Sequence, residues 1–262
     1  MNARHHDVEP GGAIVVDARG LGKRYGQKVA VSAVDLAIPR GAFYGLVGPN
    51  GAGKTTLIRM MVGLLRTDSG TVGVLGKPVW TEPGGVKDRV GVLPDDLRLF
   101  ERLTGQELLT YLGLLRDLPR DTVDERTTAL LATLGLTDDA STLVADYSTG
   151  MRKKVALAAA LLHAPHVLFL DEPFESVDPI SARVITEVLD TYRHRGGSVV
   201  FSSHVMDTVE RLCDHVTILA AGAVVRSGTL DDVRGGKRLD DAFADAVGAP
   251  LDAAGELDWL RA

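Results

Sequence analysis

Cysteine is almost absent from this sequence. Cys213 is the only one in 262 residues, so no internal disulfide can form and a reducing compartment is expected. The longest purely apolar run is Val155–Leu162, much shorter than the roughly 20 residues of a membrane-spanning helix. The opening residues, MNARHHDVEPGG, are polar and do not resemble a signal peptide. We therefore expect a chain that does not cross a membrane by itself.

Basic residues are also fewer than acidic ones. Lysine and arginine number 29 against 35 acidic residues, which gives a net charge of −6. This balance argues against nucleic acid as a partner, because neutralising its phosphates requires a basic surface. It does not exclude a small anionic ligand, which responds to a local field. The length fits one large α/β domain or two small ones.

Strand and helix patterns alternate along much of the chain. Alternating apolar residues predict strands at 13–19 and 29–38, with Tyr25 in the turn between them. Further strands are expected at 42–47, 70–75, 90–93, 167–170, 198–202 and 216–220, and helices at 55–65, 104–118, 123–136, 146–162, 179–195 and 205–213. Parallel strands covered by helices on both faces are the natural packing. We expect a disordered tail at 1–11, a main domain at 12–230 with a helical subdomain at about 96–162, and a helical appendage at 231–262.

The segment GPNGAGKT, from Gly48 to Thr55, matches the pattern G-x-x-x-x-G-K-[ST] between an apolar strand and a helix. Its glycines let successive backbone N–H groups point at one anion, and the N-terminus of the next helix adds positive potential. Lys54 can reach the β- and γ-phosphates of a nucleotide, and the hydroxyl of Thr55 can bind Mg²⁺. The pattern predicts a phosphate site; the alternative is a glycine-rich turn with an incidental lysine.

Two carboxylates follow the apolar strand VLFL. Asp171 suits Mg²⁺ held through its water shell, and Glu172 suits a general base that orients an attacking water. The alternative is an Asp-Glu pair that caps a helix before Pro173. His204 follows the strand SVVFSS, at the edge where α/β sheets place ligands, so we expect it to approach the γ-phosphate.

A second turn suited to an anion opens the helical stretch DYSTGMRKKVALAAALL. Ser148 and Gly150 fall where a helix N-terminus offers free N–H groups. The alternative is an ordinary N-cap in which Ser148 accepts from the next turn. The basic residues Arg152, Lys153 and Lys154 are expected to form a solvated face, with some electrostatic help for the phosphate.

With these motifs in this order, the chain resembles the ATP-binding subunits of ABC transporters over about residues 12–230. The resemblance rests on Gly48–Thr55, GVLPDD, YSTGM, VLFLDEP, SVDP and SSH. It implies an α/β P-loop NTPase with a RecA-like core, an N-terminal antiparallel β subdomain and an inserted α-helical subdomain. It also implies ATP and Mg²⁺ as cofactors.

In this family two ATP-binding domains pack head to tail, and the signature turn of each caps the γ-phosphate held by the other. The resemblance thus assigns Ser148 and Gly150 to the ATP of a second ATP-binding subunit, and it places Tyr25 against adenine. It implies catalytic roles for Glu172, His204 and Lys54; nucleotide contacts from Tyr25, Gly48, Asn50, Gly51, Gly53, Lys54, Thr55, Thr56, Ser148, Gly150 and Asp178; and metal contacts from Thr55, Asp171 and Asp95.

Three segments depart from the family pattern. In the signature turn, Thr149 replaces a glycine and Met151 replaces a glutamine. Asp95 stands where the family has glutamine, so a carboxylate that can still ligate metal or water adds negative charge. In the segment Glu175–Asp178, only Asp178 is the residue that the family pattern has at its position. The change at Asp95 bears on how hydrolysis is coupled to a partner more than on ATP binding.

The leading hypothesis is an ATPase subunit, likened to export-type single-domain members, that powers export through a separate integral-membrane subunit. It would work as a dimer, most simply of identical chains, at the inner face of the cell membrane, and would dock through the helical block around Leu97–Leu115. Two alternatives stay open: a soluble ABC-type ATPase with an assembly role outside transport, and a regulatory module that senses ATP without turnover.

Overall fold

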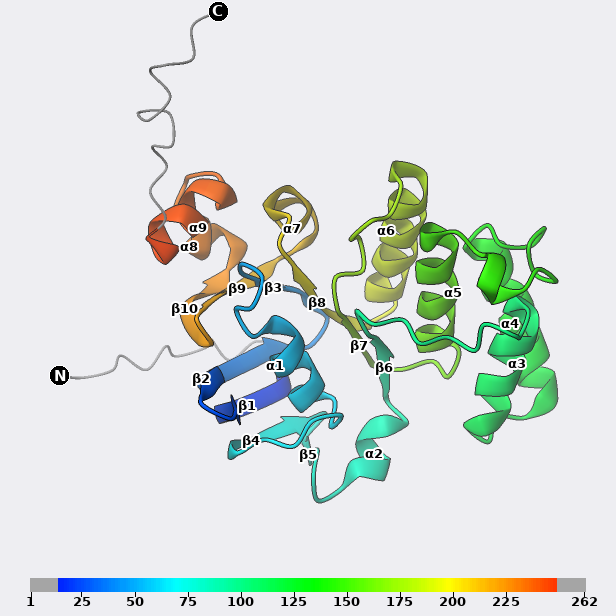
Figure 1. Cartoon of the computed structure of the whole chain (residues 1–262), viewed down its shortest axis with the longest axis horizontal. Helices are drawn as coiled ribbons and strands as arrows, with labels where there is room; N and C mark the ends of the chain where they lie inside the picture. Colours follow the sequence, from blue (N-terminus) through cyan, green and yellow to red (C-terminus); the bar gives the residue numbers. More distant parts are fainter. Residues whose placement is uncertain (1–13, 249–262) are drawn as a thin grey trace, which may run out of the picture.

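Two β-sheets of different kinds organise the computed structural model, which describes residues 14–248 (Figure 1). The expected tail at 1–11 and the last part of the expected appendage lie outside these residues. The four-stranded sheet has the order β2-β1-β4-β5 and is antiparallel, and the six-stranded sheet has the order β10-β9-β3-β8-β7-β6. The strands are β1 (Ile14–Tyr25), β2 (Lys28–Pro39), β3 (Phe43–Val47), β4 (Ser69–Val74), β5 (Lys77–Pro78), β6 (Val90–Leu93), β7 (Val167–Leu170), β8 (Ser198–Ser203), β9 (His215–Ala220) and β10 (Ala223–Thr229).

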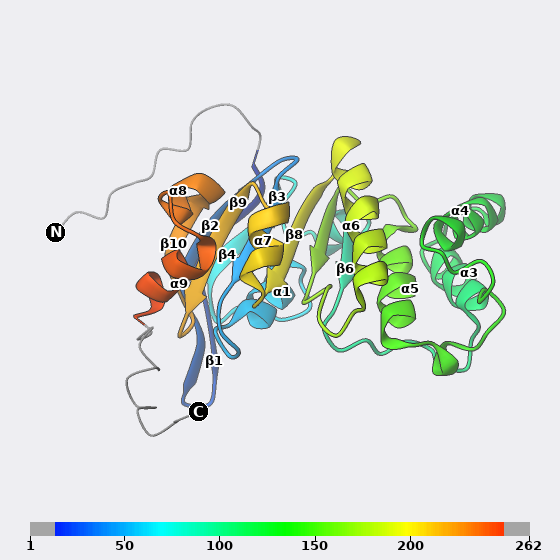
Figure 2. The same ribbon diagram turned by 90° about the horizontal axis from the view of Figure 1, so that it is seen from above.

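The helices cover the larger sheet and extend beyond one edge of it (Figures 1 and 2). They are α1 (Lys54–Met61), α2 (Pro83–Lys87), α3 (Gly105–Leu115), α4 (Arg120–Thr133), the 3₁₀ turn η1 (Val144–Asp146), α5 (Thr149–Leu161), α6 (Pro179–His194), α7 (Met206–Leu212), α8 (Leu230–Arg234) and α9 (Leu239–Val247). Within residues 14–248, no helix combines the length and the apolar character needed to cross a bilayer.

Strand β3 shows why both faces of the larger sheet are buried. Phe43 and Val47 contribute to a core shared with α5, α6 and α7, while Tyr44 and Leu46 contribute to a second core. This second core also holds the apolar face of α1 and the inner face of the antiparallel sheet, so α1 lies between the two sheets. Strands buried on both sides read as continuous apolar runs, which is the pattern of β3 and β7.

The predicted combination of a mostly parallel sheet, an antiparallel sheet and inserted helices is confirmed. The strands expected at 90–93 and 167–170 have those bounds. The first strand was expected to end at residue 19 but continues to Tyr25, and α1 ends at Met61 rather than at residue 65. Gly63, with φ +75°, takes the left-handed conformation that stops a helix. The limits of the helical subdomain, 96 and 162, stay a prediction.

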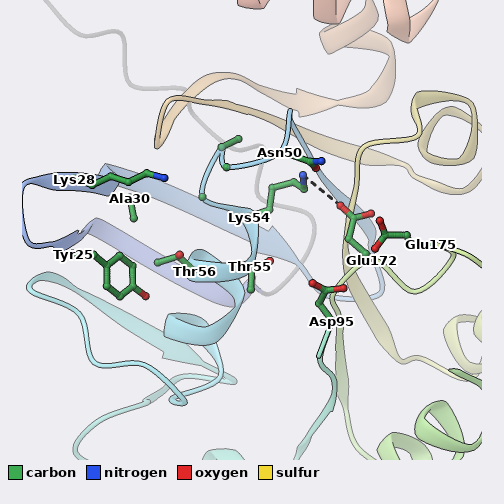
Figure 3. Close-up of a pocket in the computed structure, with 13 residues that line it drawn as sticks. Tyr25, Lys28, Ala30, Asn50, Lys54, Thr55, Thr56, Asp95, Glu172 and Glu175 are labelled. Atoms are coloured by element: carbon green, nitrogen blue, oxygen red, sulfur yellow. Dashed lines mark ion pairs between the residues drawn. The ribbon is translucent and has the colours of Figure 1, made fainter. Parts of the chain in front are cut away.

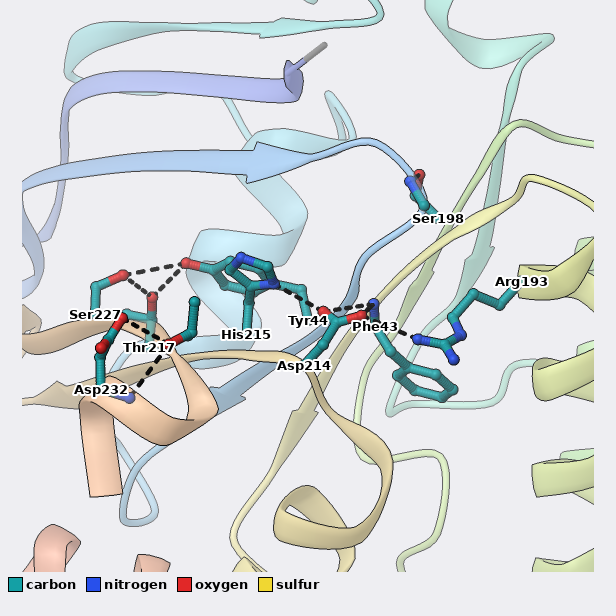
Figure 4. A network of polar contacts seen from close by, with 11 residues as sticks. Phe43, Tyr44, Arg193, Ser198, Asp214, His215, Thr217, Ser227 and Asp232 are labelled. Carbon is teal, nitrogen blue, oxygen red and sulfur yellow. Dashed lines mark hydrogen bonds and ion pairs between the residues drawn. The ribbon is translucent and has the colours of Figure 1, made fainter. Parts of the chain in front are cut away.

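Asp214 ties three elements together at the sheet edge where β3 and β9 begin (Figure 4). Its carboxylate oxygens accept the backbone N–H of Phe43 at 3.1 and 3.2 Å, and Oδ2 also accepts Arg193 Nη1 of α6 at 3.0 Å. His215 Nδ1 lies 2.8 Å from Oδ1. Burial acts to raise the pKa of Asp214, but His215, the Phe43 N–H and Arg193 outweigh it and lower that pKa below its ordinary value.

We predict that Asp214→Ala lowers the free energy of unfolding by about 2 kcal/mol, because it leaves the Phe43 N–H and the Arg193 guanidinium without this acceptor. Urea unfolding followed by circular dichroism measures the change. The control is Glu187→Ala, which breaks an exposed pair with Arg183 on α6 and should cost about 0.5 kcal/mol or less.

The same variant should show a defined pH dependence. Because the folded-state pKa of Asp214 is depressed, its contribution is complete at neutral pH and is lost as the pH falls through that depressed pKa. The stability gap between wild type and Asp214→Ala should therefore narrow in acid. A gap that is absent at neutral pH, or that widens in acid, would contradict the assignment.

Candidate functional site

The loop between β3 and α1 is shaped to leave its backbone N–H groups open to an anion. Gly53 is the N-cap residue of α1 and has φ +105°. A Cβ atom there would collide with the carbonyl oxygen of Ala30, and one at Gly48 would collide with that of Leu219. These positions accept only glycine, so no side chain fills the cradle in front of the helix N-terminus.

This loop forms one wall of a cavity of about 420 Å³ (Figure 3). The antiparallel sheet contributes a second wall and the carboxyl end of the parallel sheet contributes a third. The lining residues are Tyr25, Lys28, Ala30, Asn50, Gly51, Ala52, Gly53, Lys54, Thr55, Thr56, Asp95, Glu172 and Glu175. Sequence reasoning named most of them as site residues but not Lys28, Ala30, Ala52 and Glu175. Lys28 and Ala30 carry no motif, whereas Ala52 lies within the phosphate loop and Glu175 within the segment Glu175–Asp178.

Glu172 lies at the centre of the charged groups. Successive residues of a strand point to opposite faces, yet Asp171 and Glu172 both lie next to the phosphate loop, Asp171 beside Thr55 and Glu172 beside Lys54. The backbone of Glu172, whose φ of +47° is left-handed, departs from strand geometry directly after β7. The Glu172 carboxylate lies 3.4 Å from Lys54 Nζ and 3.1 Å from His204 Nδ1, and this side chain is only 11% exposed.

Lys54 is held beneath the phosphate loop. Its Nζ donates to the carbonyl oxygen of Gly48 at 2.8 Å and pairs with Glu172 across the cavity edge. The side chain is buried despite its charge, and its two partners explain how this is tolerated. The ammonium therefore has a fixed position at the inner end of the cavity.

Asp171 is buried beneath this surface. Its Oδ1 accepts the hydroxyl of Ser202 at 2.6 Å. Burial raises the pKa of Asp171, the neighbouring carboxylates of Asp95 and Glu172 raise it further, and the hydroxyls of Ser202 and Thr55 oppose the change. The ionised form of such a carboxylate is disfavoured, and a cation placed close to it would stabilise that form.

The second predicted turn lies outside this cavity. Ser148 is the N-cap of α5 and its Oγ accepts the N–H of Met151 at 3.2 Å. Asp178 caps α6 in the same way, through Ile180 and Ser181. A Cβ on Gly150 would lie 2.8 Å from Asp178 Oδ2, so the two caps pack against each other. None of Ser148, Gly150 and Asp178 lines the cavity of its own chain.

The prediction of a solvated basic face on α5 is wrong. Lys153 and Lys154 are buried, and Arg152 is partly covered and paired with Glu101 at 2.7 Å. Lys153 Nζ donates to the backbone carbonyl of Glu172 at 2.8 Å. The helical spacing of the sequence indicates this burial, because positions 153 and 154 fall on the same face of α5 as the buried residues Gly150 and Leu157.

Comparison with known proteins agrees with this geometry. A family model described as ABC transporter matches residues 31–175. The daunorubicin resistance ATP-binding protein DrrA3 of Streptomyces coeruleorubidus is 39% identical over 240 residues, which is 89% of this chain and 74% of that protein. The Nod factor export ATP-binding protein I of Bradyrhizobium diazoefficiens is 34% identical over 218 residues, which is 83% and 71% of the two chains.

A solved structure described as that of an ATP binding subunit of an ABC transporter shares the whole architecture. It superposes with a TM-score of 0.82 at 29% identity, over 88% of this chain and 99% of that chain. The match confirms the predicted P-loop NTPase fold. Motif order, site geometry, sequence relatives and fold agree, and the chain belongs to the ABC transporter family, as an ATP-binding subunit that hydrolyses ATP.

Proposed function

We propose that this chain hydrolyses ATP to power export of a substrate through a separate membrane subunit, at the cytoplasmic face of the membrane. The observation that carries the proposal is the convergence of Lys54, Glu172 and His204. They come from the start of α1 and from the ends of β7 and β8, and the Glu172 carboxylate lies 3.4 Å from Lys54 Nζ and 3.1 Å from His204 Nδ1. Export is taken from the names of the two relatives, which refer to drug resistance and to export.

The cavity offers ATP one site for its phosphates and one for its base. The phosphate loop would receive the phosphates through backbone N–H groups, with Lys54 on the β- and γ-phosphates. Tyr25 is 50% exposed at the end of β1 and faces the same cavity, so its ring is free to stack on adenine. Stacking accepts any base, so the selectivity for adenine should be modest.

The donor set suits Mg²⁺ bound together with a nucleotide. Among residues 14–248, no cluster of three or more acidic, histidine or cysteine side chains could hold a metal alone. Mg²⁺ in nucleotide sites takes one or two protein ligands and completes its shell with water and phosphate oxygens. Thr55 and the buried Asp171 would supply those ligands, with Asp95 nearby on the cavity wall. When bound, the ion neutralises charge on the phosphates.

Glu172 and His204 would act on the water that attacks the γ-phosphate. The Glu172 carboxylate can accept a proton from that water or fix its orientation, since it faces the cavity beside Lys54. His204 Nδ1 is directed at the other carboxylate oxygen, which leaves Nε2 to contact the phosphate. The hydrogen bond to His204 also holds the Glu172 side chain in one orientation.

The turn at Ser148 would complete the site of a second subunit. It lies at the N-terminus of α5, whose helix dipole and free N–H groups favour an anion, but it is remote from the cavity of its own chain. Head-to-tail pairing of two chains brings each turn to the partner's phosphates. ATP would then link the two subunits, because its charge is shared by both loops.

A membrane subunit would dock on the helical region. Phe100, which precedes α3, and Tyr111 of α3 are exposed there and pack edge-to-face with ring centroids 5.3 Å apart. Leu114 and Leu115, also of α3, are exposed as well. An apolar group of this kind on a surface suits a protein contact. The segment overlaps the docking region expected from the sequence at Leu97–Leu115.

The first test replaces Glu172 by glutamine. Glu172→Gln should reduce ATP turnover by at least about 100-fold, because an amide cannot accept the proton, while the Kd for ATP should stay within about threefold. Phosphate release and fluorescent-nucleotide titration measure the two quantities. Glu187→Gln, on the exposed face of α6, is the matched control and should behave as wild type. Turnover retained by Glu172→Gln would remove Glu172 from the mechanism.

The second test concerns Ser148 and uses the Glu172→Gln chain with Mg-ATP to accumulate dimers. Ser148→Asp keeps a good N-cap but places negative charge opposite the partner's phosphates, so we expect the dimer Kd to rise by at least about tenfold. Ser148→Asn keeps the cap without the charge and is the control. Analytical ultracentrifugation measures the Kd. Equal values for the two variants would place Ser148 outside the interface.

The third test concerns Tyr25. Tyr25→Ala should raise the Kd for ATP by roughly 10-fold through loss of stacking, and Tyr25→Trp should leave it unchanged or lower it. Because Tyr25 is half exposed at the end of a strand, neither change should alter the melting temperature by more than about 2 °C. If Tyr25→Ala bound ATP as tightly as wild type does, adenine would lie elsewhere.

A further inference from the structure

Lys153 contacts the main chain of Glu172, although the sequence pattern predicts it only on a solvated basic face with some electrostatic help for the phosphate. It is only 5% exposed, on the face of α5 that packs against the core. Its ammonium donates to the backbone carbonyl oxygen of Glu172 at 2.8 Å. The same oxygen accepts the N–H of Glu175 at 3.2 Å, which closes the turn after β7. Lys153 therefore contacts the main chain at the base of the catalytic side chain.

Glu172 needs such support because its backbone is left-handed, at φ +47°. A residue with a branched or long side chain occupies this region only when its surroundings impose it. Two hydrogen bonds do so here. The Glu172 N–H donates to Ser202 Oγ at 2.9 Å, and the Glu172 carbonyl accepts from Lys153. One bond comes from β8 and the other from α5, so the strained residue is held from both sides.

The positive charge of Lys153 is also matched by the carboxylates around it. Burial lowers its pKa, and the carboxylates around it oppose that change, with Asp95 first among them. Asp95 is the residue that adds a negative charge to the family pattern. A buried cation next to it offsets that charge without contacting the cavity.

We propose that Lys153 is a positioning residue for Glu172, which it holds by the main-chain carbonyl so that the carboxylate stays beside Lys54 and His204. The inference rests on the proposed role of Glu172 in ATP hydrolysis. It has a consequence for the dimer, because α5 begins at the Ser148 turn. The helix that serves the partner's ATP at its N-terminus thus holds, one turn later, the carboxylate that serves the ATP of its own chain.

The experiment measures steady-state ATP hydrolysis by the full-length chain carrying Lys153→Met. We expect kcat to fall about 10- to 100-fold, since a misplaced reactive group costs factors of this size, and KM for ATP to stay within about threefold. Lys153→Arg, which keeps the charge and the donors, should recover at least part of kcat. The control is Lys154→Met, because Lys154 is also buried on α5 and, within the described residues, has no hydrogen bond to Glu172.

Every variant is assayed well below its own melting temperature, and ATP binding is titrated in parallel. A second readout is the comparison of Lys153→Arg with Lys153→Met. A positioning role predicts that the arginine, which keeps a donor for the Glu172 carbonyl, recovers kcat, whereas a loss caused only by poorer packing of α5 would leave the two variants alike.

The outcomes separate this inference from the function on which it rests. If Glu172→Gln abolishes turnover but Lys153→Met matches Lys154→Met in kcat, the positioning role is wrong and the proposed function stands. If Glu172→Gln itself retains turnover, the proposed role of Glu172 fails first. A rise in KM at constant kcat for Lys153→Met would also overturn the inference, because it would place the lysine in nucleotide binding.

Discussion

The left-handed backbone at Glu172 is the constraint on which the site depends. It turns the chain within one residue of the end of β7, so that two consecutive carboxylates serve one site at different depths. Asp171 stays buried on Ser202, and Glu172 reaches the cavity edge between Lys54 and His204. The parallel sheet brings the proposed catalytic residues together, because β3, β7 and β8 end at the same side of it. Lys54 begins the helix that follows β3, and Glu172 and His204 follow β7 and β8.

Acidic side chains outnumber basic ones in the lining of the cavity, although ATP is a highly charged anion. Asp95, Glu172 and Glu175 line the cavity, and Asp171 lies just beneath it, while Lys54 and Lys28 are the cations of the lining. Backbone N–H groups at the N-terminus of α1 offset part of this negative charge locally. In the proposed complex with nucleotide and Mg²⁺, the remaining carboxylates would favour the divalent cation, and a purely cationic pocket would lack that linkage. Binding of nucleotide and of metal should therefore depend on each other.

Much of the architecture could be predicted because the informative residues are local. Short apolar runs, followed by Pro94 and by Asp171, identified β6 and β7 with their bounds, and the phosphate-loop pattern placed Lys54 and Thr55. What could not be predicted comes from contacts between distant segments. The left-handed backbone of Glu172 is held by hydrogen bonds with Ser202 and Lys153, which belong to other elements. No residue next to Glu172 in the sequence indicates this conformation. Lys153 itself was misjudged because a run of basic residues usually faces solvent.

The packing of α5 against α6 explains which departures from the family's signature turn are tolerated. Thr149 replaces a family glycine at an exposed position, where a side chain meets solvent. Gly150 is buried, and a Cβ there would press on Asp178 Oδ2 and Ser181 Oγ. Asp178 in turn holds the first N–H groups of α6. Gly150 is therefore required by the contact between the two helix caps. Position 149, where this chain has threonine in place of the family glycine, makes no such contact. Because the caps touch, the Ser148 turn and the Glu172–Asp178 segment are mechanically joined within one chain, and a partner's ATP bound at the turn would bear directly on the segment that carries Glu172.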